Sequence, residues 1–87
     1  MSSLIIIKYM KKREAENISR EVIDILKKER QSRNISRYKI AKDTGLSESS
    51  LSYIERKSQQ PSLTTLLIIA SYLKINLGKI ISEFDEN

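Results

Sequence analysis

Apolar residues recur at helical spacing along most of the chain, starting near residue 18. The first such stretch predicts a helix over residues 19–33. Its acidic residues come early and its basic residues come late, which suits the helix dipole. Asn34 is predicted to end this helix. The apolar stripe expected to face the core consists of Ile18, Val22, Ile25 and Leu26.

Four shorter helices are predicted after the first, and each is bounded by polar start or stop signals. They cover residues 37–44, 48–56, 62–73 and 77–84. Ser36 and Ser47 are expected to cap two of them, and Gly45 follows the end of the helix over 37–44. In the helix over 62–73 the inward positions are Leu63, Leu66, Ile69, Ala70 and Leu73. Five helices joined by brief turns predict an all-α domain over residues 18–87.

The N-terminal residues 1–17 differ from the rest and are predicted to form a separate arm. Three consecutive isoleucines within Leu4–Met10 favour a short strand, because β-branched side chains lose freedom in a helix. A lone strand needs a partner strand, which a symmetry-related copy in a dimer would supply. A frayed arm, or a segment that simply leads into the first helix, is the alternative that the sequence leaves open.

The composition excludes several kinds of chemistry. The chain has 87 residues, enough for one small domain, and it contains no cysteine and no histidine. Disulfides, thiolate zinc sites, thiol nucleophiles and imidazole proton shuttles are therefore not available. Two glycines do not make a phosphate-binding loop. We expect neither a metal nor another cofactor, and we do not expect an enzyme.

The charge favours a polyanionic partner. Sixteen basic residues against eleven acidic ones give a net charge of +5, and the isoelectric point is near 9.6. Seven cations and a single anion fall between residues 27 and 42. No signal-peptide core is apparent at the start of the chain, so a soluble protein of the cytoplasm is expected.

The segment over residues 36–56 carries the most specific signal. The segment consists of a two-turn helix, a turn opened by Gly45 and a second helix with a polar outer face. In such a motif the second helix protrudes from the domain. The major groove of B-DNA, about 12 Å wide, admits one α-helix. The pattern therefore indicates a surface that reads a DNA groove, although an ordinary solvated helix face has the same polarity.

This segment resembles the Xre family, the helix-turn-helix regulators related to the lambda and Cro-type phage repressors. The resemblance covers about residues 20–82 and is most specific in the pair Ile40-Ala41, in Gly45 at the turn and in the pair Ile54-Glu55 that closes the third helix. It implies a compact lambda-repressor-like fold that binds double-stranded DNA with its third helix in the major groove.

The family resemblance assigns base contacts to the first turn of the third helix and to the outward position one turn later. The residues at these places are Glu48, Ser49, Ser52 and Tyr53. Glu48 is suited to accept a hydrogen bond from a cytosine amino group, and the serines can donate or accept. Tyr53 is suited to a thymine methyl group or to a phosphate. Ordinary solvent-facing polarity remains the alternative for each of them.

Phosphate contacts are implied at the start of the second helix and in the segment after the third. The residues concerned are Ser36, Arg37, Ser47, Arg56, Lys57, Ser58 and Gln59. Lys57 stands where the family usually has glycine. Either it adopts a left-handed backbone conformation at a cost of about 1 kcal/mol, or the loop follows another path.

Two further roles follow, one from the resemblance and one from the apolar pattern. The resemblance implies that Arg30 and Glu55 form a structural pair that sets the angle of the third helix. Apolar residues beyond the needs of the core predict a homodimer, which would place two recognition helices about 34 Å apart on a palindromic operator. The predicted interface residues are Leu67, Ile68, Tyr72, Ile81 and Phe84. Alternatively, these side chains cover the segment Leu4–Met10 of the same chain.

The function predicted from all of this is a sequence-specific transcriptional regulator, a homodimer that represses by occluding a promoter. The alternative is an antitoxin-type interaction module that binds a second protein through residues 1–17 and also regulates its own promoter. Loss of a co-purifying chain on deletion of residues 1–17 would favour the alternative.

Overall fold

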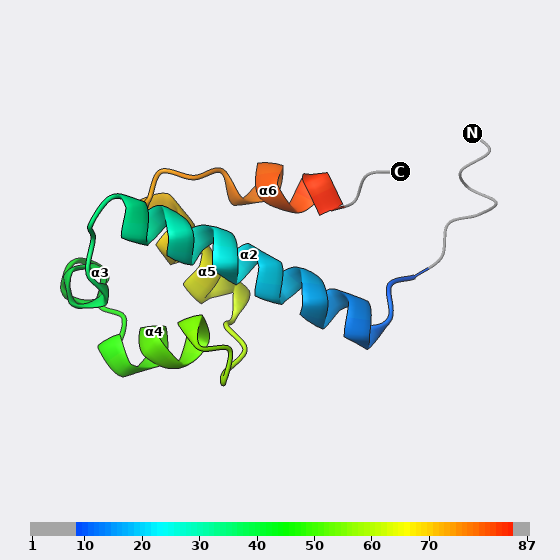
Figure 1. Ribbon diagram of the computed structural model, residues 1–87, viewed down its shortest axis with the longest axis horizontal. Coiled ribbons are helices and arrows are strands. Elements are labelled where there is room, and N and C mark those ends of the chain that lie inside the picture. Colours follow the sequence, from blue (N-terminus) through cyan, green and yellow to red (C-terminus); the bar gives the residue numbers. More distant parts are fainter. Residues whose placement is uncertain (1–8, 85–87) are drawn as a thin grey trace.

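The chain folds into five α-helices over residues 9–84, the part that this computed structural model describes (Figure 1). The helices are α2 (Lys12–Ser32), α3 (Arg37–Thr44), α4 (Glu48–Glu55), α5 (Leu63–Tyr72) and α6 (Leu77–Phe84). No strand occurs between residues 9 and 84, so the predicted all-α class is confirmed. The strand predicted for Leu4–Met10 lies almost wholly outside these residues, and Tyr9 and Met10 have no regular secondary structure.

Helix α2 is longer than the sequence pattern predicts. It begins at Lys12, so the predicted start at residue 19 is wrong by seven residues. The Glu14 carboxylate accepts a hydrogen bond of 3.0 Å from the backbone N–H of Lys11, which satisfies one donor of the first turn. Lys, Arg, Glu and Ala dominate this turn, and all are good helix formers. The prediction followed the apolar stripe, which begins later than the helix itself.

The other helix ends agree with the prediction to within one residue, and local hydrogen bonds explain why. Three N-cap serines each accept a bond from the backbone N–H three residues later. The pairs are Ser36 with Lys39 at 3.0 Å, Ser47 with Ser50 at 3.2 Å, and Ser62 with Thr65 at 3.1 Å. At the end of α3, Gly45 takes the left-handed conformation with φ 85°.

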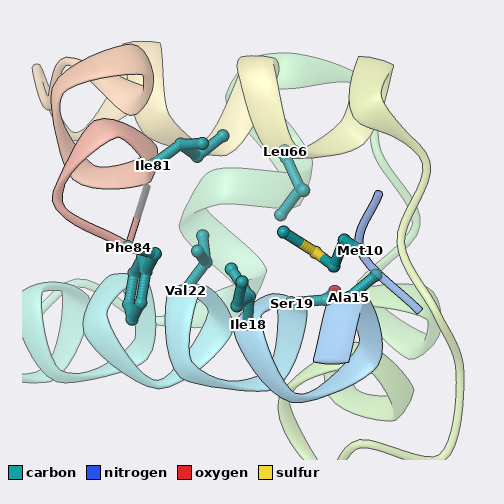
Figure 2. A pocket seen from close by; sticks show the side chains of 8 residues that line it. All are labelled: Met10, Ala15, Ile18, Ser19, Val22, Leu66, Ile81 and Phe84. Carbon is teal, nitrogen blue, oxygen red and sulfur yellow. The ribbon is translucent and has the colours of Figure 1, made fainter. Parts of the chain in front are cut away.

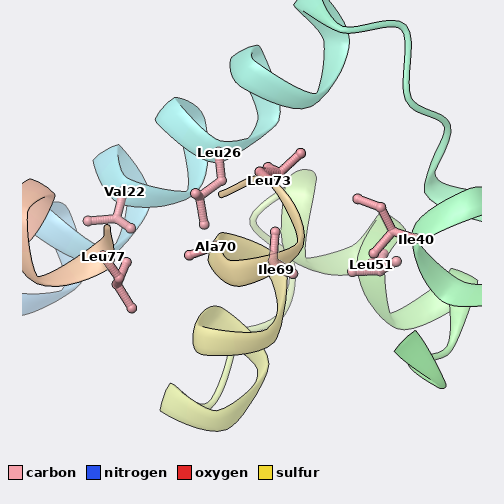
Figure 3. Close-up of a cluster of buried hydrophobic side chains, with 8 residues drawn as sticks. All are labelled: Val22, Leu26, Ile40, Leu51, Ile69, Ala70, Leu73 and Leu77. Carbon is pink, nitrogen blue, oxygen red and sulfur yellow. The ribbon is translucent and has the colours of Figure 1, made fainter. Parts of the chain in front are cut away.

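The hydrophobic core draws on all five helices (Figure 3). Its buried side chains are Val22, Leu26, Ile40, Leu51, Ile69, Ala70, Leu73 and Leu77. Leu73, just after α5, is completely buried, and Ile40 of α3 and Leu51 of α4 are nearly so. Because α3 and α4 each anchor to the shared core through such residues, their positions relative to α2 and α5 are set by packing.

Two residues predicted to face inward are exposed instead. Ile25 is 38% exposed and Leu63 is 62% exposed, whereas Ile23 is buried. At 3.6 residues per turn, Ile25 points about a quarter turn or more away from the stripe that contains Ile23. Leu63 is the first residue of α5, where no preceding turn covers it.

Helices α5 and α6 meet at a sharp bend. No single helix within residues 9–84 is long and apolar enough to span a membrane. The two helices meet that criterion only when taken together, and they are bent by 118° at the break between them.

Candidate functional site

Helices α3 and α4 form a helix–turn–helix at one end of the molecule (Figure 1). The connection consists of residues 45–47, and its path is stabilised by Thr44. The Thr44 hydroxyl donates to the carbonyl of Ile40 at 2.6 Å and accepts a bond from the N–H of Leu46 at 3.3 Å. Figure 1 shows α4 along the outer edge of the molecule, with α2 and α5 on its inner side.

Helix α4 has one buried side and one open side. Leu51 and Ile54 are buried in the core. On the opposite side Glu48 and Ser49 are exposed, and Tyr53 is 46% exposed. Ser52, the fourth residue predicted to contact bases, is half-buried. The predicted base-reading residues therefore gather on a face that is open to an external ligand.

Side chains on this face interact with residues predicted to bind phosphate. The hydroxyl groups of Ser47 and Ser49 lie 2.9 Å apart and share a hydrogen bond. The guanidinium of Arg56 lies over the Tyr53 ring, 5.0 Å from its centroid, in a cation–π arrangement. The flat Arg56–Tyr53 pair thus presents a positive charge next to an aromatic surface.

The Glu55 carboxylate links three helices. It accepts two bonds from Arg30, from Nε at 2.7 Å and from Nη2 at 2.9 Å. It also accepts one from Nη1 of Arg37 at 3.0 Å. Arg30 also donates from Nη1 to the carbonyl of Ile35 at 2.6 Å. The structure therefore brings the predicted pair together and adds Arg37 to it, which joins α2, α3 and α4 through one side chain.

This arrangement changes the surroundings of Arg37, which the resemblance assigned to a phosphate. Its side chain is 38% exposed, and part of its guanidinium is bound to Glu55. Its Nε atom is buried without a hydrogen-bond partner among the described residues. Arg37 therefore lies at the start of α3, held from inside by Glu55 while the rest of the group faces outward.

In the segment after α4, Lys57 adopts the left-handed backbone conformation, the first of its two predicted alternatives. Lys57 has φ 64°, and its N–H donates to the carbonyl of Ile54 at 2.9 Å. Both the N–H and the hydroxyl of Ser58 donate to the carbonyl of Tyr53, at 2.9 and 3.1 Å. The Lys57 ammonium lies 2.6 Å from a carboxylate oxygen of Asp24 on α2. Arg56 and Gln59 remain exposed.

Contacts between distant residues support the site, and the sequence analysis did not identify them. Asp24 holds Lys57, and the Ser19 hydroxyl donates to the side-chain carbonyl of Gln60 at 3.1 Å. These two contacts attach the segment after α4 to α2. No spacing or motif signal points to either pair, because the partners lie 33 and 41 positions apart along the chain.

A second missed contact attaches α3 to α5. The Tyr72 hydroxyl donates to Asp43 at 2.6 Å, and the ammonium of Lys39 lies 3.1 Å from the same carboxylate. The bond from Tyr72, followed by that from Lys39, holds the pKa of Asp43 below its ordinary value. The same contact with Asp43 raises the pKa of Tyr72 and that of Lys39.

The residues predicted for the dimer interface fall into two groups. Leu67 is 51% exposed and Ile81 is 41% exposed, so both are accessible. Ile68 is half-buried. Tyr72 and Phe84 are partly buried and pack against the core of their own subunit. The accessible large apolar residues on α5 and α6 are therefore Leu63, Leu67 and Ile81, and of these Leu67 and Ile81 belong to the predicted interface.

The basic stretch over residues 27–42 is partly neutralised in the folded chain. Arg33 pairs with Glu29 at 2.7 Å, and Lys39 with Asp43 at 3.1 Å. Three cations of this stretch have no ion-pair partner in the part of the chain that the structure describes: Lys27, Lys28 and Lys42. Between residues 9 and 84 no cluster of three potential metal ligands occurs.

Comparison with known proteins agrees with this geometry. A family model described as helix-turn-helix matches residues 26–80, which include α3, α4, the turn between them and all of α5. No curated protein and no solved structure gives a significant match. The family match covers more than half of the chain and contains the open face of α4. The chain therefore belongs to the helix-turn-helix family of Xre and lambda repressor-like DNA-binding proteins.

Proposed function

We propose that this protein is a sequence-specific transcriptional repressor that inserts α4 into the major groove of its operator and blocks a promoter. One observation carries the proposal: the side of α4 opposite Leu51 and Ile54 is polar, exposed and free of covering helices (Figure 1). An α-helix with such a face fits the width of the major groove. Family membership supports DNA binding, and the repressor role is our inference from it.

Base readout is assigned to the open face of α4. Glu48 at the first turn accepts from a cytosine amino group, and Ser49 bonds either kind of base edge. Ser52, which is half-buried, reaches a base only where the groove floor comes close to the helix. Tyr53 packs on a thymine methyl group, and its contact with Arg56 orients the ring for that purpose.

Phosphate binding is assigned to the two ends of the helix–turn–helix. The oxygens of Ser36 and Ser47 already accept backbone N–H bonds, so their hydroxyl hydrogens are the groups offered to phosphate, and Ser49 is then the donor of the bond that it shares with Ser47. Arg37 offers the donors that Glu55 does not use, beside the positive end of α3. Lys57 is held by Asp24 and must release it to bind DNA. The remaining proposed contacts are Arg56, Ser58 and Gln59.

The repressor is proposed to act as a homodimer on a palindromic operator. Leu67 and Ile81 provide accessible apolar surface, to which the exposed edges of Ile68, Tyr72 and Phe84 add. Two-fold pairing of this surface places the two α4 helices about 34 Å apart, one turn of DNA. Such a repressor would act in the cytoplasm, at the nucleoid.

Selection of bound fragments from a random DNA duplex pool tests the proposal. We expect enrichment of one palindrome with half-sites about 10 base pairs apart, and protection of both half-sites in a footprint. A pool that binds without enrichment of any sequence would show that the protein does not read bases, and would overturn the proposal.

A further inference from the structure

An apolar hollow of about 410 Å³ lies between the first half of α2, the middle of α5 and the end of α6 (Figure 2). Its walls include Ile18 and Val22 from α2, Leu66 from α5, and Ile81 and Phe84 from α6. The volume falls in the range of small ligand sites, about 300–1,000 Å³. We call this hollow the α2–α6 groove. It lies away from the DNA-reading face of α4.

The chain enters α2 directly beside this groove. Met10, two residues before the start of the helix, is one of its lining residues, and Figure 2 shows its thioether directed toward Leu66. Met10 itself remains about half exposed, so it fills the groove only in part. The segment that precedes α2 therefore contacts the groove through Met10, the last apolar residue before the helix begins.

We propose that the aliphatic segment Leu4–Ile7 of the same chain docks in the α2–α6 groove. Only Lys8 and Tyr9 separate this segment from Met10. An extended chain covers about 3.3 Å per residue, so the six residues from Met10 back to Leu4 can span about 20 Å, which allows the segment to reach the lining that Met10 already contacts. Four aliphatic side chains match an apolar lining, and burying them removes apolar surface from water.

The short connection between the segment and Met10 favours docking in the groove of the same chain over docking in the groove of a second copy. Two groups joined by a few residues meet at an effective concentration in the millimolar range, far above the concentration of free copies in a cell. Docking covers Ile81 and Phe84, which the proposed dimer surface also includes, so it restricts a partner subunit to Leu67 and the exposed edges of Ile68 and Tyr72. The inference concerns the free protein and does not depend on DNA binding.

Disulfide trapping tests the proposal, because the chain has no cysteine of its own. Ile6→Cys combined with Ile81→Cys places one thiol in the segment and one at the groove. Ile6→Cys combined with Lys42→Cys is the control, since α3 lies at the opposite end of the molecule from the start of α2 (Figure 1). Each double variant is oxidised with glutathione disulfide, without DNA, in a mixture of ¹⁵N-labelled and unlabelled protein.

The expected result is an intramolecular disulfide that forms at least tenfold faster for Ile6–Ile81 than for the control pair. Equal rates for the two pairs would overturn the proposal. A covalent dimer that joins labelled and unlabelled chains as the main product would also overturn it, and would show that the segment docks on a second copy.

Thermal unfolding gives an independent measurement. Ile5→Asp combined with Ile6→Asp should lower the Tm by about 5–10 °C, since it places charges in an apolar groove. Ser2→Asp combined with Ser3→Asp adds the same charge next to the segment and should leave the Tm nearly unchanged. Equal Tm values for the two variants would contradict docking. Light scattering on both variants shows whether any change comes from a change in molar mass.

Discussion

At the scale of single residues, Glu55 has the most demanding position in the protein. Its carboxylate is only 12% exposed and lies between the guanidinium groups of Arg30 and Arg37. A buried carboxylate with two cationic partners contributes little net stability compared with an apolar side chain, but losing its charge leaves the buried guanidinium of Arg30 without its partner. Because the three residues belong to three helices, the orientation of α4 depends on this one side chain.

We expect Glu55→Gln to lower the free energy of unfolding by about 3–5 kcal/mol, as measured by urea denaturation. The matched control is Glu29→Gln, which removes the exposed pair with Arg33 on α2. That pair should contribute less than about 1 kcal/mol. Equal losses in the two variants would show that Glu55 has no special structural role.

The proposed base readout also depends on single residues. Ser49→Ala and Tyr53→Ala should each flatten the preference at particular operator positions, at about 1–3 kcal/mol per lost contact. The measurement is binding to a panel of operators with single base changes. Ser71→Ala, at an exposed serine on α5, serves as the control. A preference that persists with both residues replaced would place the readout elsewhere.

Arg37→Ala should weaken binding to all DNA sequences alike and lower the slope of log affinity against log salt by about one unit per subunit. The reason is the loss of one phosphate contact with its released counterion. Titrations between 50 and 200 mM salt measure the slope. Lys79→Ala on α6 removes the same charge away from α4 and should leave the slope unchanged; an unchanged slope in Arg37→Ala would argue against its phosphate role.

At the scale of elements, the two helices of the DNA-binding motif are attached to the rest by different chemistry. Helix α4 is attached through Leu51 and Ile54 in the core and through Glu55. Helix α3 has a single buried apolar residue, Ile40, and adds the polar contact between Asp43 and Tyr72. The contact between Asp43 and Tyr72 should therefore make the stability of α3 depend on pH.

The expected pH dependence follows from the lowered pKa of Asp43. Its stabilising contribution is present above the ordinary aspartate pKa near 3.8 and is lost as the pH falls through the lower pKa of the folded state. The raised pKa of Tyr72 affects stability at high pH. The stabilising contribution of the Tyr72 hydroxyl is present below pH 10 and is lost as the pH rises through the higher pKa of the folded state.

Thermal unfolding between pH 5 and pH 2 tests this contact. The Tm of Asp43→Asn should fall less steeply with decreasing pH than that of the wild type, because no carboxylate of lowered pKa remains to be protonated at position 43. Tyr72→Phe should show part of the same effect. Glu21→Gln, an exposed acid on α2, is the control and should keep the wild-type slope. A wild-type slope in Asp43→Asn would refute the proposed role of the contact.

At the scale of the whole molecule, the proposed DNA-reading surface and the accessible apolar surface belong to different elements. The polar face of α4 lies along one edge, and the accessible apolar residues Leu67 and Ile81 belong to α5 and α6 (Figure 1). This separation is what a dimeric repressor needs, because a partner can cover one surface without blocking the other.

Leu67→Asp should convert the proposed dimer into a monomer, as measured by light scattering. The change removes Leu67 from both subunits, and because each side chain is already about half-buried in the monomer, the two together contribute about 1.5–3 kcal/mol. Affinity for a full palindrome should therefore fall about 10- to 100-fold, with little change on a single half-site. Ile25→Asp changes an exposed apolar residue on α2 and should leave the molar mass unchanged. A monomeric wild type would refute the dimer.

Features that depend on neighbours three or four positions apart could be predicted from the sequence. The N-cap serines Ser36, Ser47 and Ser62 determine where α3, α4 and α5 begin, and the turn residue Gly45 determines where α3 ends. The exposed face of α4 also follows from the spacing of Leu51 and Ile54. These features are local because each hydrogen bond or helix face involves a single turn.

The tertiary structure alone decided which side chains meet across helices. Arg37 on Glu55 and Tyr72 on Asp43 join residues 18 and 29 positions apart, and the α2–α6 groove needs three helices to exist. Whether Ile23 or Ile25 faces inward was likewise settled by the angle at which α2 packs on the core. Such contacts depend on how whole helices dock, and the spacing of residues within one helix carries no information about the side chains of another.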